Sequence, residues 1–153
     1  MNVANPYLML GLQLAPLSYQ RLIRLVPVDR WDERTDPQRF SFREAVAHVN
    51  DWEPILLHRM QTALVSPGAT IQAYDEATRA VEQNYAATDP LEQAAQLAER
   101  REITVRFLRN EGEGNWENLV IHPERGPMTL VDQANMILGH DHYHLEHLTQ
   151  YLA

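Results

Sequence analysis

The sequence predicts an all-α fold, a four-helix bundle with a long crossover between its second and third helices. Four long segments repeat apolar side chains at the three- and four-residue spacing of amphipathic helices. Roughly 25 residues separate the second segment from the third, which is too long for a hairpin, so these two helices should run parallel. The 153 residues, 44% of them hydrophobic, suit a single domain over residues 1–153.

The first helix should begin with Asn5 as its N-cap and Pro6 as its first residue, and its apolar series continues to Val26. Pro16 lies inside this range. Because proline lacks an N–H and its ring clashes with the preceding turn, Pro16 should kink or divide the helix. Residues 27–40 are rich in aspartate and proline, which is typical of a loop with at most one short turn.

Ser41 and Glu44 have the spacing of a capping box, which predicts a second helix running to about Leu64. The apolar stripe of this helix is its expected buried face: Phe42, Ala45, Val46, Val49, Trp52, Leu56 and Met60. His48 lies at the edge of the stripe. Glu53 lies near its centre, so a buried Glu53 would need a partner.

Two further residues of the second helix carry expectations. Pro54 leaves the carbonyl of Asn50 without its usual helical donor, so a bend is expected just after His48. His58 faces outward from the stripe and is expected on the surface.

The long connection, residues 66–89, contains a plausible short helix at 74–86. Asp89 and Pro90 then form the N-cap and first residue of a third helix, which runs to about Asn110. Arg101 and Glu102 interrupt the apolar positions of this helix. The positions expected to face inward are Leu91, Ala94, Ala95, Ala98, Val105 and Leu108. Residues 116–126 are expected to form a loop.

The final helix, residues 129–152, begins with Thr129 as its N-cap and Asp132 in its first turn. Its apolar residues recur at helical spacing with little β-branching: Leu130, Ala134, Ile137, Leu138, Leu145, Leu148 and Leu152. This context argues against a strand, in which His140, His142 and His144 would share one face.

On a helix, His140 and His144 share one face about 6 Å apart along the axis, so two imidazoles can converge on one ion. His142 points away from them. His147 returns to the same face about 10 Å from His140, which is far for a shared ion and indicates a place beside the site or in a cleft. An isolated H-x-x-x-H is a weak signal for a metal and is more often a solvated polar edge.

Composition narrows the chemistry. The chain has no cysteine and no lysine, which excludes thiolate nucleophiles, cysteine–zinc sites and Schiff bases. The net charge of −8, without a basic tract, argues against a nucleic-acid partner. No apolar run is long enough for a membrane span and no secretory signal is visible, so a cytoplasmic location is expected.

Several short motifs occur in a fixed order: a histidine before Asp51-Trp-Glu53, an arginine midway along the third helix, Trp116 before His-Pro and Gly126-x-x-Thr-Leu, and the final H-x-x-x-H. Together they resemble the DinB/YfiT-like metalloenzyme family over nearly the whole chain. The resemblance implies a three-histidine site for a divalent metal, zinc or nickel above all, made by His48, His140 and His144. It also implies a possible homodimer.

The resemblance implies thiol-dependent transferase or isomerase chemistry on small-molecule substrates, with a thiol such as bacillithiol, mycothiol or glutathione. Three imidazoles would leave an ion open positions, where it lowers the pKa of bound water to about 7 or deprotonates a thiol. Three functions stay open: a metal-dependent enzyme that activates a low-molecular-weight thiol for S-transfer, a metal-hydroxide hydrolase, and a non-catalytic metal- or ligand-binding bundle.

No catalytic residue is assigned, but Glu53, Arg101, Asp141 and His147 are candidates beside the metal. Arg101 is expected to face the interior and pair with Glu53 or Asp141; alternatively, its stem lies along the surface and its head reaches solvent. Asp141 adjoins His140 and is expected to orient a metal ligand from another helix by accepting the free ring N–H of that ligand. The family often has another polar residue at the position of His147, so its role is open.

Overall fold

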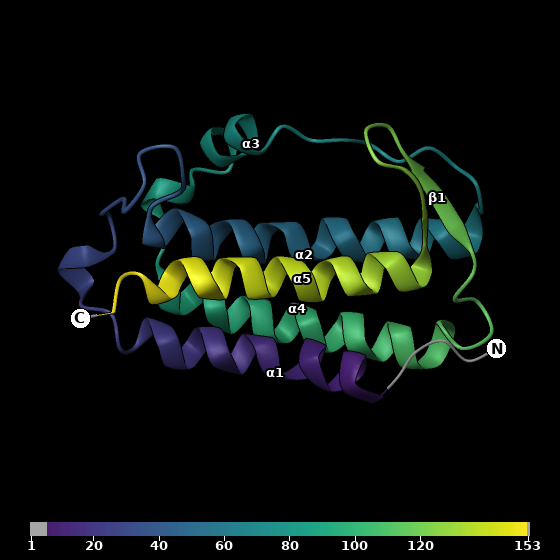
Figure 1. Cartoon of the computed structure of the whole chain (residues 1–153), viewed down its shortest axis with the longest axis horizontal. Helices are drawn as coiled ribbons and strands as arrows, with labels where there is room; N and C mark the ends of the chain where they lie inside the picture. Colours follow the sequence, from purple (N-terminus) through teal and green to yellow (C-terminus); the bar gives the residue numbers. More distant parts are fainter. Residues whose placement is uncertain (1–5, 153) are drawn as a thin grey trace.

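The computed structural model describes residues 6–152 and contains four long helices. These are α1 (Pro6–Ile23), α2 (Phe42–Val65), α4 (Pro90–Glu111) and α5 (Leu130–Thr149). The colour gradient in Figure 1 shows that α2 and α4 run in the same direction and that α1 and α5 run against them. The predicted four-helix bundle with a long crossover is therefore confirmed.

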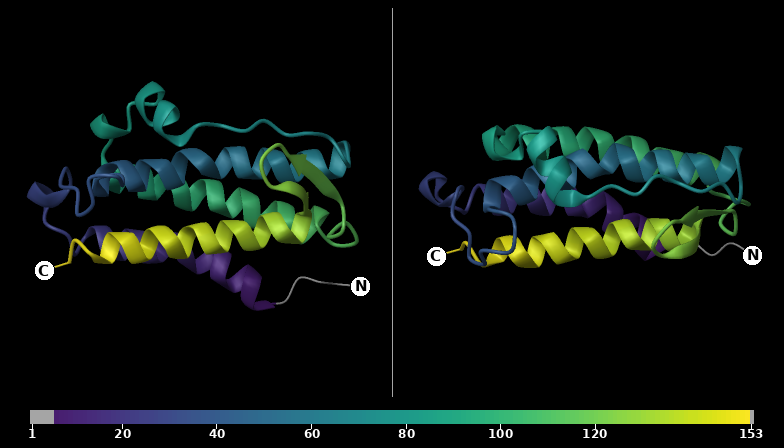
Figure 2. Two further views of the ribbon diagram at one scale, coloured as in Figure 1. Left: turned by 45° about the horizontal axis from the view of Figure 1, so that its top comes forward. Right: turned by 90° about the horizontal axis from the view of Figure 1, so that it is seen from above.

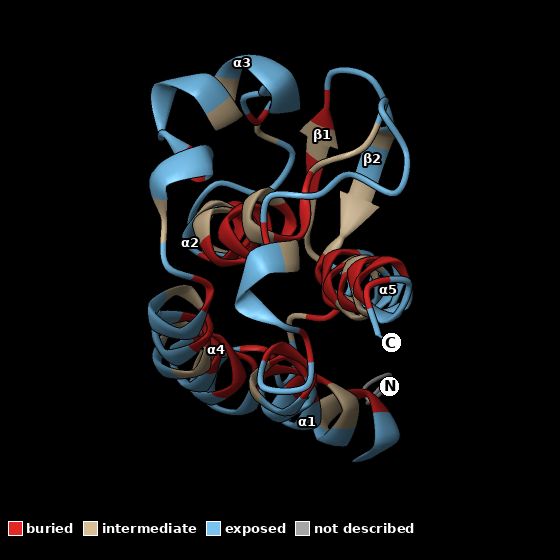
Figure 3. Ribbon diagram, turned by 90° about the vertical axis from the view of Figure 1, so that its left-hand side faces the viewer, coloured by how far each residue is buried: buried red, intermediate tan, exposed pale blue. Residues whose placement is uncertain are grey.

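The helices form a square in which α1 packs on α4, α4 on α2, α2 on α5 and α5 on α1. Figure 3 shows this arrangement end-on, with the buried faces of all four helices turned inward. Helices α4 and α5 are thus diagonal partners. No helix within residues 6–152 is both long and apolar enough to cross a membrane.

A polar layer interrupts the core. One hydrophobic cluster surrounds Tyr19, Phe42 and Tyr151, and a second surrounds Leu12, Trp52 and Ile137. The buried polar residues at the junction of the two clusters come from three helices: His48 and Glu53 of α2, Arg101 and Thr104 of α4, and Asp141 and His144 of α5. Such a layer is costly unless each polar group has a partner or a function.

The predicted capping boxes start α2 and α5. The backbone N–H of Glu44 donates to Ser41 Oγ at 3.3 Å, and that of Ser41 donates to the Glu44 carboxylate at 2.8 Å. Thr129 and Asp132 exchange the same pair of bonds at 3.2 and 2.9 Å. Asn5, the expected cap of α1, lies outside the described residues.

Pro16 does not divide α1, which is one helix over its whole length and bends visibly in Figure 2. The carbonyl of Leu12, freed by this proline, accepts a hydrogen bond from Arg101 Nη1 at 3.1 Å. Helix α2 likewise continues through Pro54, and the freed carbonyl of Asn50 accepts from Arg100 at 2.8 Å. Two adjacent arginines of α4 therefore supply the donors that the two prolines remove.

The inward face of α4 differs from the expected one. Leu91 is 46% exposed and Ala95 is also exposed, so their expected burial is wrong. The buried positions follow a three- and four-residue spacing through the arginine: Ala94, Leu97, Arg101, Thr104, Val105 and Leu108. Arg101 belongs to the buried stripe, and reading it as an interruption shifted the predicted face.

Residues 116–126, expected to be a loop, contain most of a β-hairpin. Strands β1 (Leu119–His122) and β2 (Gly126–Thr129) pair antiparallel, and Gly126 takes the positive φ of 78° at the start of β2. Backbone bonds from the crossover to β1 add support, including Ile71 N–H to Ile121 O at 2.9 Å. Strands this short carry too little alternation to be recognised in the sequence.

The crossover passes over the α2–α5 face of the bundle together with the hairpin (Figure 1). It contains α3 (Glu76–Glu82), within the range expected for a short helix, and the 3-10 turn η2 (Tyr85–Ala87). A second 3-10 turn, η1 (Val28–Arg30), lies in the expected loop after α1. Arg79 and Tyr85 both donate to the carboxylate of Asp51 on α2, the tyrosine at 2.6 Å, and so fasten the crossover to the bundle.

Candidate metal centre

Three histidines from two neighbouring helices meet in the polar layer. His48 comes from α2, and His140 and His144 come from consecutive turns of α5. The Nε2 atoms of His48 and His140 are 3.0 Å apart, and one nitrogen of each of the three rings lies within 4.8 Å of the others. The structure thus brings together the three histidines that the sequence singled out.

Burial keeps these imidazoles neutral. His48 is 1% exposed, His144 is also buried and His140 is half-buried. Burial lowers the pKa of His48 to about 3, that of His140 to about 4 and that of His144 to about 2, with smaller contributions from the neighbouring charges. Neutral imidazole is the form that binds a metal, so the site needs no deprotonation above pH 5.

The donor set fits a first-row divalent ion. Three neutral ring nitrogens with no carboxylate among them suit zinc or nickel better than magnesium or calcium, which prefer oxygen. Nδ1 of His48 and Nδ1 of His144 are buried without a hydrogen-bond partner. In His48 the nitrogen that approaches His140 is Nε2, so its unpaired Nδ1 is the other ring nitrogen, and the convergence of the rings itself carries the argument for a metal.

Arg101 joins all four long helices beside the histidines. Its guanidinium donates to both oxygens of Glu53 at 2.8 Å, to the two oxygens of Asp141 at 2.6 and 3.0 Å, and to the carbonyl of Leu12 at 3.1 Å. These contacts occupy all five of its N–H donors. Arg101 is 2% exposed, so the alternative in which its head reaches solvent is wrong.

The ion-paired cluster of Arg101, Glu53 and Asp141 carries two negative charges against one positive charge. Burial alone would lower the pKa of Arg101, but Asp141 and Glu53 raise it above its ordinary value. The charges of Arg101 and Glu53 both act on His140, which places the cluster close to the histidines. An excess of negative charge there favours a cation at the three rings.

Asp141 has a different role from the expected one. Both of its carboxylate oxygens accept from Arg101, and within residues 6–152 no hydrogen bond joins this carboxylate to a histidine. Asp141 precedes the turn that carries His144, and its backbone carbonyl also accepts from Tyr19 at 3.0 Å. These bonds fix the rotation of α5 and so position His140 and His144 together.

Two cavities open onto the three-histidine site. One, of about 420 Å³, is lined by Arg39, Phe40, Tyr143, His144 and His147, among others. The second, of about 470 Å³, lies toward the hairpin and is lined by Trp52, Arg59, Met136, His140 and Tyr143, among others. Glu76, His140 and Tyr143 line both cavities, and His140 is the one of the three histidines that lines the second.

His147 lies beside the site, not in it. It is 1% exposed, its Nε2 has no partner, and it lines the first cavity with Arg39. Burial and then the charge of Arg39 lower the pKa of His147. His58 and His142 are exposed, as expected from their outward faces.

Aromatic side chains that the sequence did not single out surround His48. Its ring centroid lies 5.1 Å from that of Phe40, 5.4 Å from Trp52 and 6.2 Å from Tyr85. Trp52 was expected only as a core residue. Phe40 lies in the connection just before α2, and Tyr85 lies in the crossover between α2 and α4. Their role depends on how the loops return to α2, for which the sequence has no local signal.

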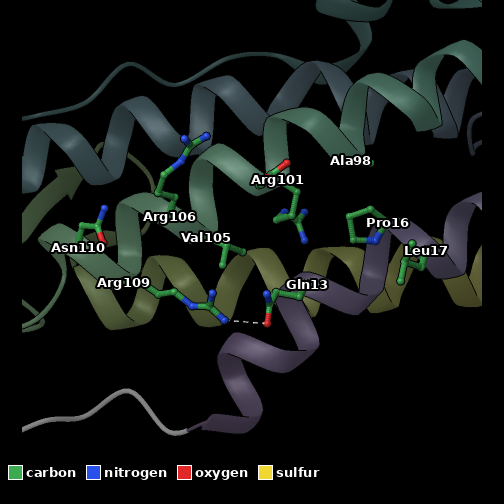
Figure 4. A pocket seen from close by; sticks show the side chains of 10 residues that line it. Gln13, Pro16, Leu17, Ala98, Arg101, Val105, Arg106, Arg109 and Asn110 are labelled. Carbon is green, nitrogen blue, oxygen red and sulfur yellow. Dashed lines mark hydrogen bonds between the residues drawn. The ribbon is translucent and has the colours of Figure 1, made fainter.

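A further cavity, of about 620 Å³, lies between α1 and α4 and contains none of the three histidines in its lining. Figure 4 shows that Arg109 of α4 spans it to reach Gln13 of α1, at a donor–acceptor distance of 3.0 Å. The three-histidine site lies instead between α2 and α5, so this cavity is separate from it.

Fold and site together define a helical-bundle protein with a three-histidine candidate metal centre at the junction of two core clusters. A family model for the DinB superfamily matches residues 12–148, and the chain belongs to that superfamily.

Two solved structures share the fold. YfiT from Bacillus subtilis, described as a probable metal-dependent hydrolase with an unusual four-helix bundle topology, superposes with a TM-score of 0.90 at 18% identity, covering 99% of this chain and 89% of YfiT. A mycothiol-dependent maleylpyruvate isomerase superposes with a TM-score of 0.74 at 15% identity, covering 93% of this chain but 59% of the isomerase. No curated protein sequence matches the chain.

Proposed function

We propose that this protein is a metal-dependent enzyme in which His48, His140 and His144 bind one divalent ion, zinc or nickel, and which activates a low-molecular-weight thiol for transfer to a small electrophile. The observation that carries the proposal is the convergence of three neutral imidazoles within 4.8 Å, two of them buried and that of His140 half-buried, beside two cavities. A structural site would be closed, whereas these cavities leave room for a ligand.

The bound ion would supply Lewis-acid stabilisation of a thiolate near neutral pH. The chain itself has no cysteine, so the thiol must come from a separate molecule such as bacillithiol. The ion-paired cluster of Arg101, Glu53 and Asp141 joins α2, α4 and α5 beside the three histidines. The mycothiol dependence of the similarly folded isomerase supports this reading.

A hydrolase is the second candidate, because YfiT, the structure with a TM-score of 0.90, is described as a probable metal-dependent hydrolase. The same three imidazoles would then serve a metal-bound water. A metal- or ligand-binding bundle without catalysis is the third possibility. The cytoplasmic location and the homodimer stay predictions.

Cobalt substitution separates the candidates. We expect thiols to change the visible spectrum of the cobalt protein by forming a thiolate–cobalt absorption band. Hydrolysis of esters or amides without any thiol would favour the hydrolase. A spectrum that no thiol perturbs, combined with no hydrolysis across broad substrate panels, would leave the non-catalytic bundle.

A further inference from the structure

Arg59 of α2 is a buried cation without a counter-ion. It is 3% exposed, and no carboxylate of residues 6–152 lies within 4.0 Å of its guanidinium. Its one hydrogen bond runs from Nη2 to the carbonyl of Gln72 at 2.8 Å, and its Nε is buried without a partner. A cation–π contact with the Trp52 ring offsets part of the cost of this buried charge, but no anion pairs with it, so Arg59 is suited to bind one. Arg101, by contrast, has every donor satisfied.

Arg125 brings a second positive charge to the same place. Both arginines line the cavity of about 470 Å³ on the hairpin side of the metal site. Burial and then the charge of Arg125 lower the pKa of Arg59, and both arginines lower the pKa of nearby His122 after burial. Glu76 is the one acidic side chain in the lining, and it forms an ion pair with neither arginine.

Arg59 is connected to the three histidines through Trp52. The guanidinium carbon of Arg59 is 5.6 Å from the centre of the Trp52 ring, and that ring is 5.4 Å from the ring of His48. Arg59 is thus separated from the candidate metal centre by one tryptophan. His140 lines the same cavity, so its cationic part and the metal centre share one space.

Much of the remaining cavity wall is apolar. The lining there consists of hydrophobic side chains: Trp52, Leu56, Met128 and Met136. Methionines adapt their shape to a ligand, and a tryptophan face packs against a slender chain. The cavity lining therefore combines two arginines, an apolar wall and His140 of the candidate metal centre.

We infer that this cavity binds a small molecule with an anionic group, a carboxylate in the simplest case, which Arg59 and Arg125 hold while its reactive group lies at the three-histidine site. The inference rests on the proposed function and adds to it the chemical class of the substrate or thiol, namely a molecule with an anionic group. Guanidinium groups match carboxylates in both charge and geometry. The competing explanation is structural, namely that Arg59 only tethers the crossover through Gln72.

The test compares two thiols of matched length on the cobalt-substituted protein, mercaptohexanoate with its carboxylate and mercaptohexanol without charge. The dissociation constant of each is read from the thiolate–cobalt band. Because a charge-assisted hydrogen bond contributes more than a neutral one, we expect mercaptohexanoate to bind about tenfold more tightly or better. Arg125→Gln should reduce this preference severalfold, and Arg59→Gln combined with Arg125→Gln should abolish it.

Arg106→Gln is the matched control, because Arg106 is exposed on α4 and lines the separate α1–α4 cavity. It should keep the full preference. Arg125 is exposed, so Arg125→Gln decides the question even if Arg59→Gln fails to fold. Equal binding of the two thiols to the unmodified protein would overturn the inference, as would a preference that survives the double variant.

Failure of the proposed function gives a different result. If neither thiol produces a cobalt band, the metal-thiol chemistry is wrong, and the anion site is then tested on the metal-free protein. There we expect hexanoate, but not hexanol, to quench tryptophan fluorescence, and Arg125→Gln to weaken that quenching severalfold. Absence of quenching by hexanoate would overturn the anion site as well.

Discussion

Arg101 and Asp141 lie on diagonally opposite helices, and two hydrogen bonds of 2.6 and 3.0 Å join them through the centre of the bundle. The next turn of α5 carries His144, and the residue before Asp141 is His140. The ion pair therefore ties the position of the candidate metal centre to the core of the fold. Several consequences can be measured.

Arg101→Ala should lower the free energy of unfolding by about 3–5 kcal/mol, because it leaves two buried carboxylates unpaired. Arg106→Ala, which removes an exposed arginine from the same helix, should cost less than about 1 kcal/mol. Urea denaturation followed by circular dichroism measures both. An Arg101→Ala protein with the stability of the control would show that the buried cluster contributes nothing to the fold.

Asp141→Asn should weaken metal binding severalfold, through charge and not through a bond to a ligand, while the helical content stays unchanged. The amide keeps the shape of the carboxylate but removes the excess negative charge beside His140, and it loosens the Arg101 contact that fixes α5. Asp132→Asn, in the exposed capping box of the same helix, serves as the control and should leave metal affinity unchanged. Competition titration with a chromophoric chelator gives the affinities; equal values for the two variants would refute the role of Asp141.

The metal-free protein should lose stability as the pH falls below about 6.5. The unfolded histidines gain protons near that pH, whereas burial lowers the folded pKa values of His48, His140 and His144 to about 3, 4 and 2. The unfolded state then binds more protons, and each histidine contributes a slope of about 1.4 kcal/mol per pH unit until its folded pKa is reached. The slope is measured from the midpoints of urea denaturation at several pH values between 7 and 5, with a chelator present to keep the protein metal-free.

His144→Ala should make that slope shallower, because one proton-binding difference between the folded and unfolded states is removed. A midpoint that does not change between pH 7 and pH 5 would contradict the burial of the three rings.

The helices and the pair His140 and His144 could be predicted because both leave local signals in the sequence, whereas His48 was assigned through the family resemblance. Capping residues, apolar periodicity and the i, i+4 spacing of His140 and His144 depend only on nearby positions. The prediction of Glu53 or Asp141 as the partner of Arg101 also depended on helical phase, and the structure joins Arg101 to both. That the histidines bind an ion stays a prediction.

The remaining features depend on tertiary contacts. The inward face of α4 was misjudged because a fully paired arginine can occupy a core position that a hydrophobic pattern assigns to neighbouring alanines. The hairpin was missed because its strands have four residues each and gain support from the distant crossover. Arg59 gave no signal at all, since only the fold shows that a charged residue of α2 is buried without a counter-ion.

Metal stoichiometry tests the central claim most directly. Untagged protein is dialysed against a mild chelator and its metal content is measured by elemental analysis, for the unmodified chain and for alanine variants. We predict one divalent ion per unmodified chain, loss of most of it in His48→Ala, His140→Ala or His144→Ala, and full retention in His58→Ala and His142→Ala, whose side chains are exposed. Stoichiometric metal retained by the His48→Ala, His144→Ala double variant would contradict the account, because the ion would then be bound elsewhere.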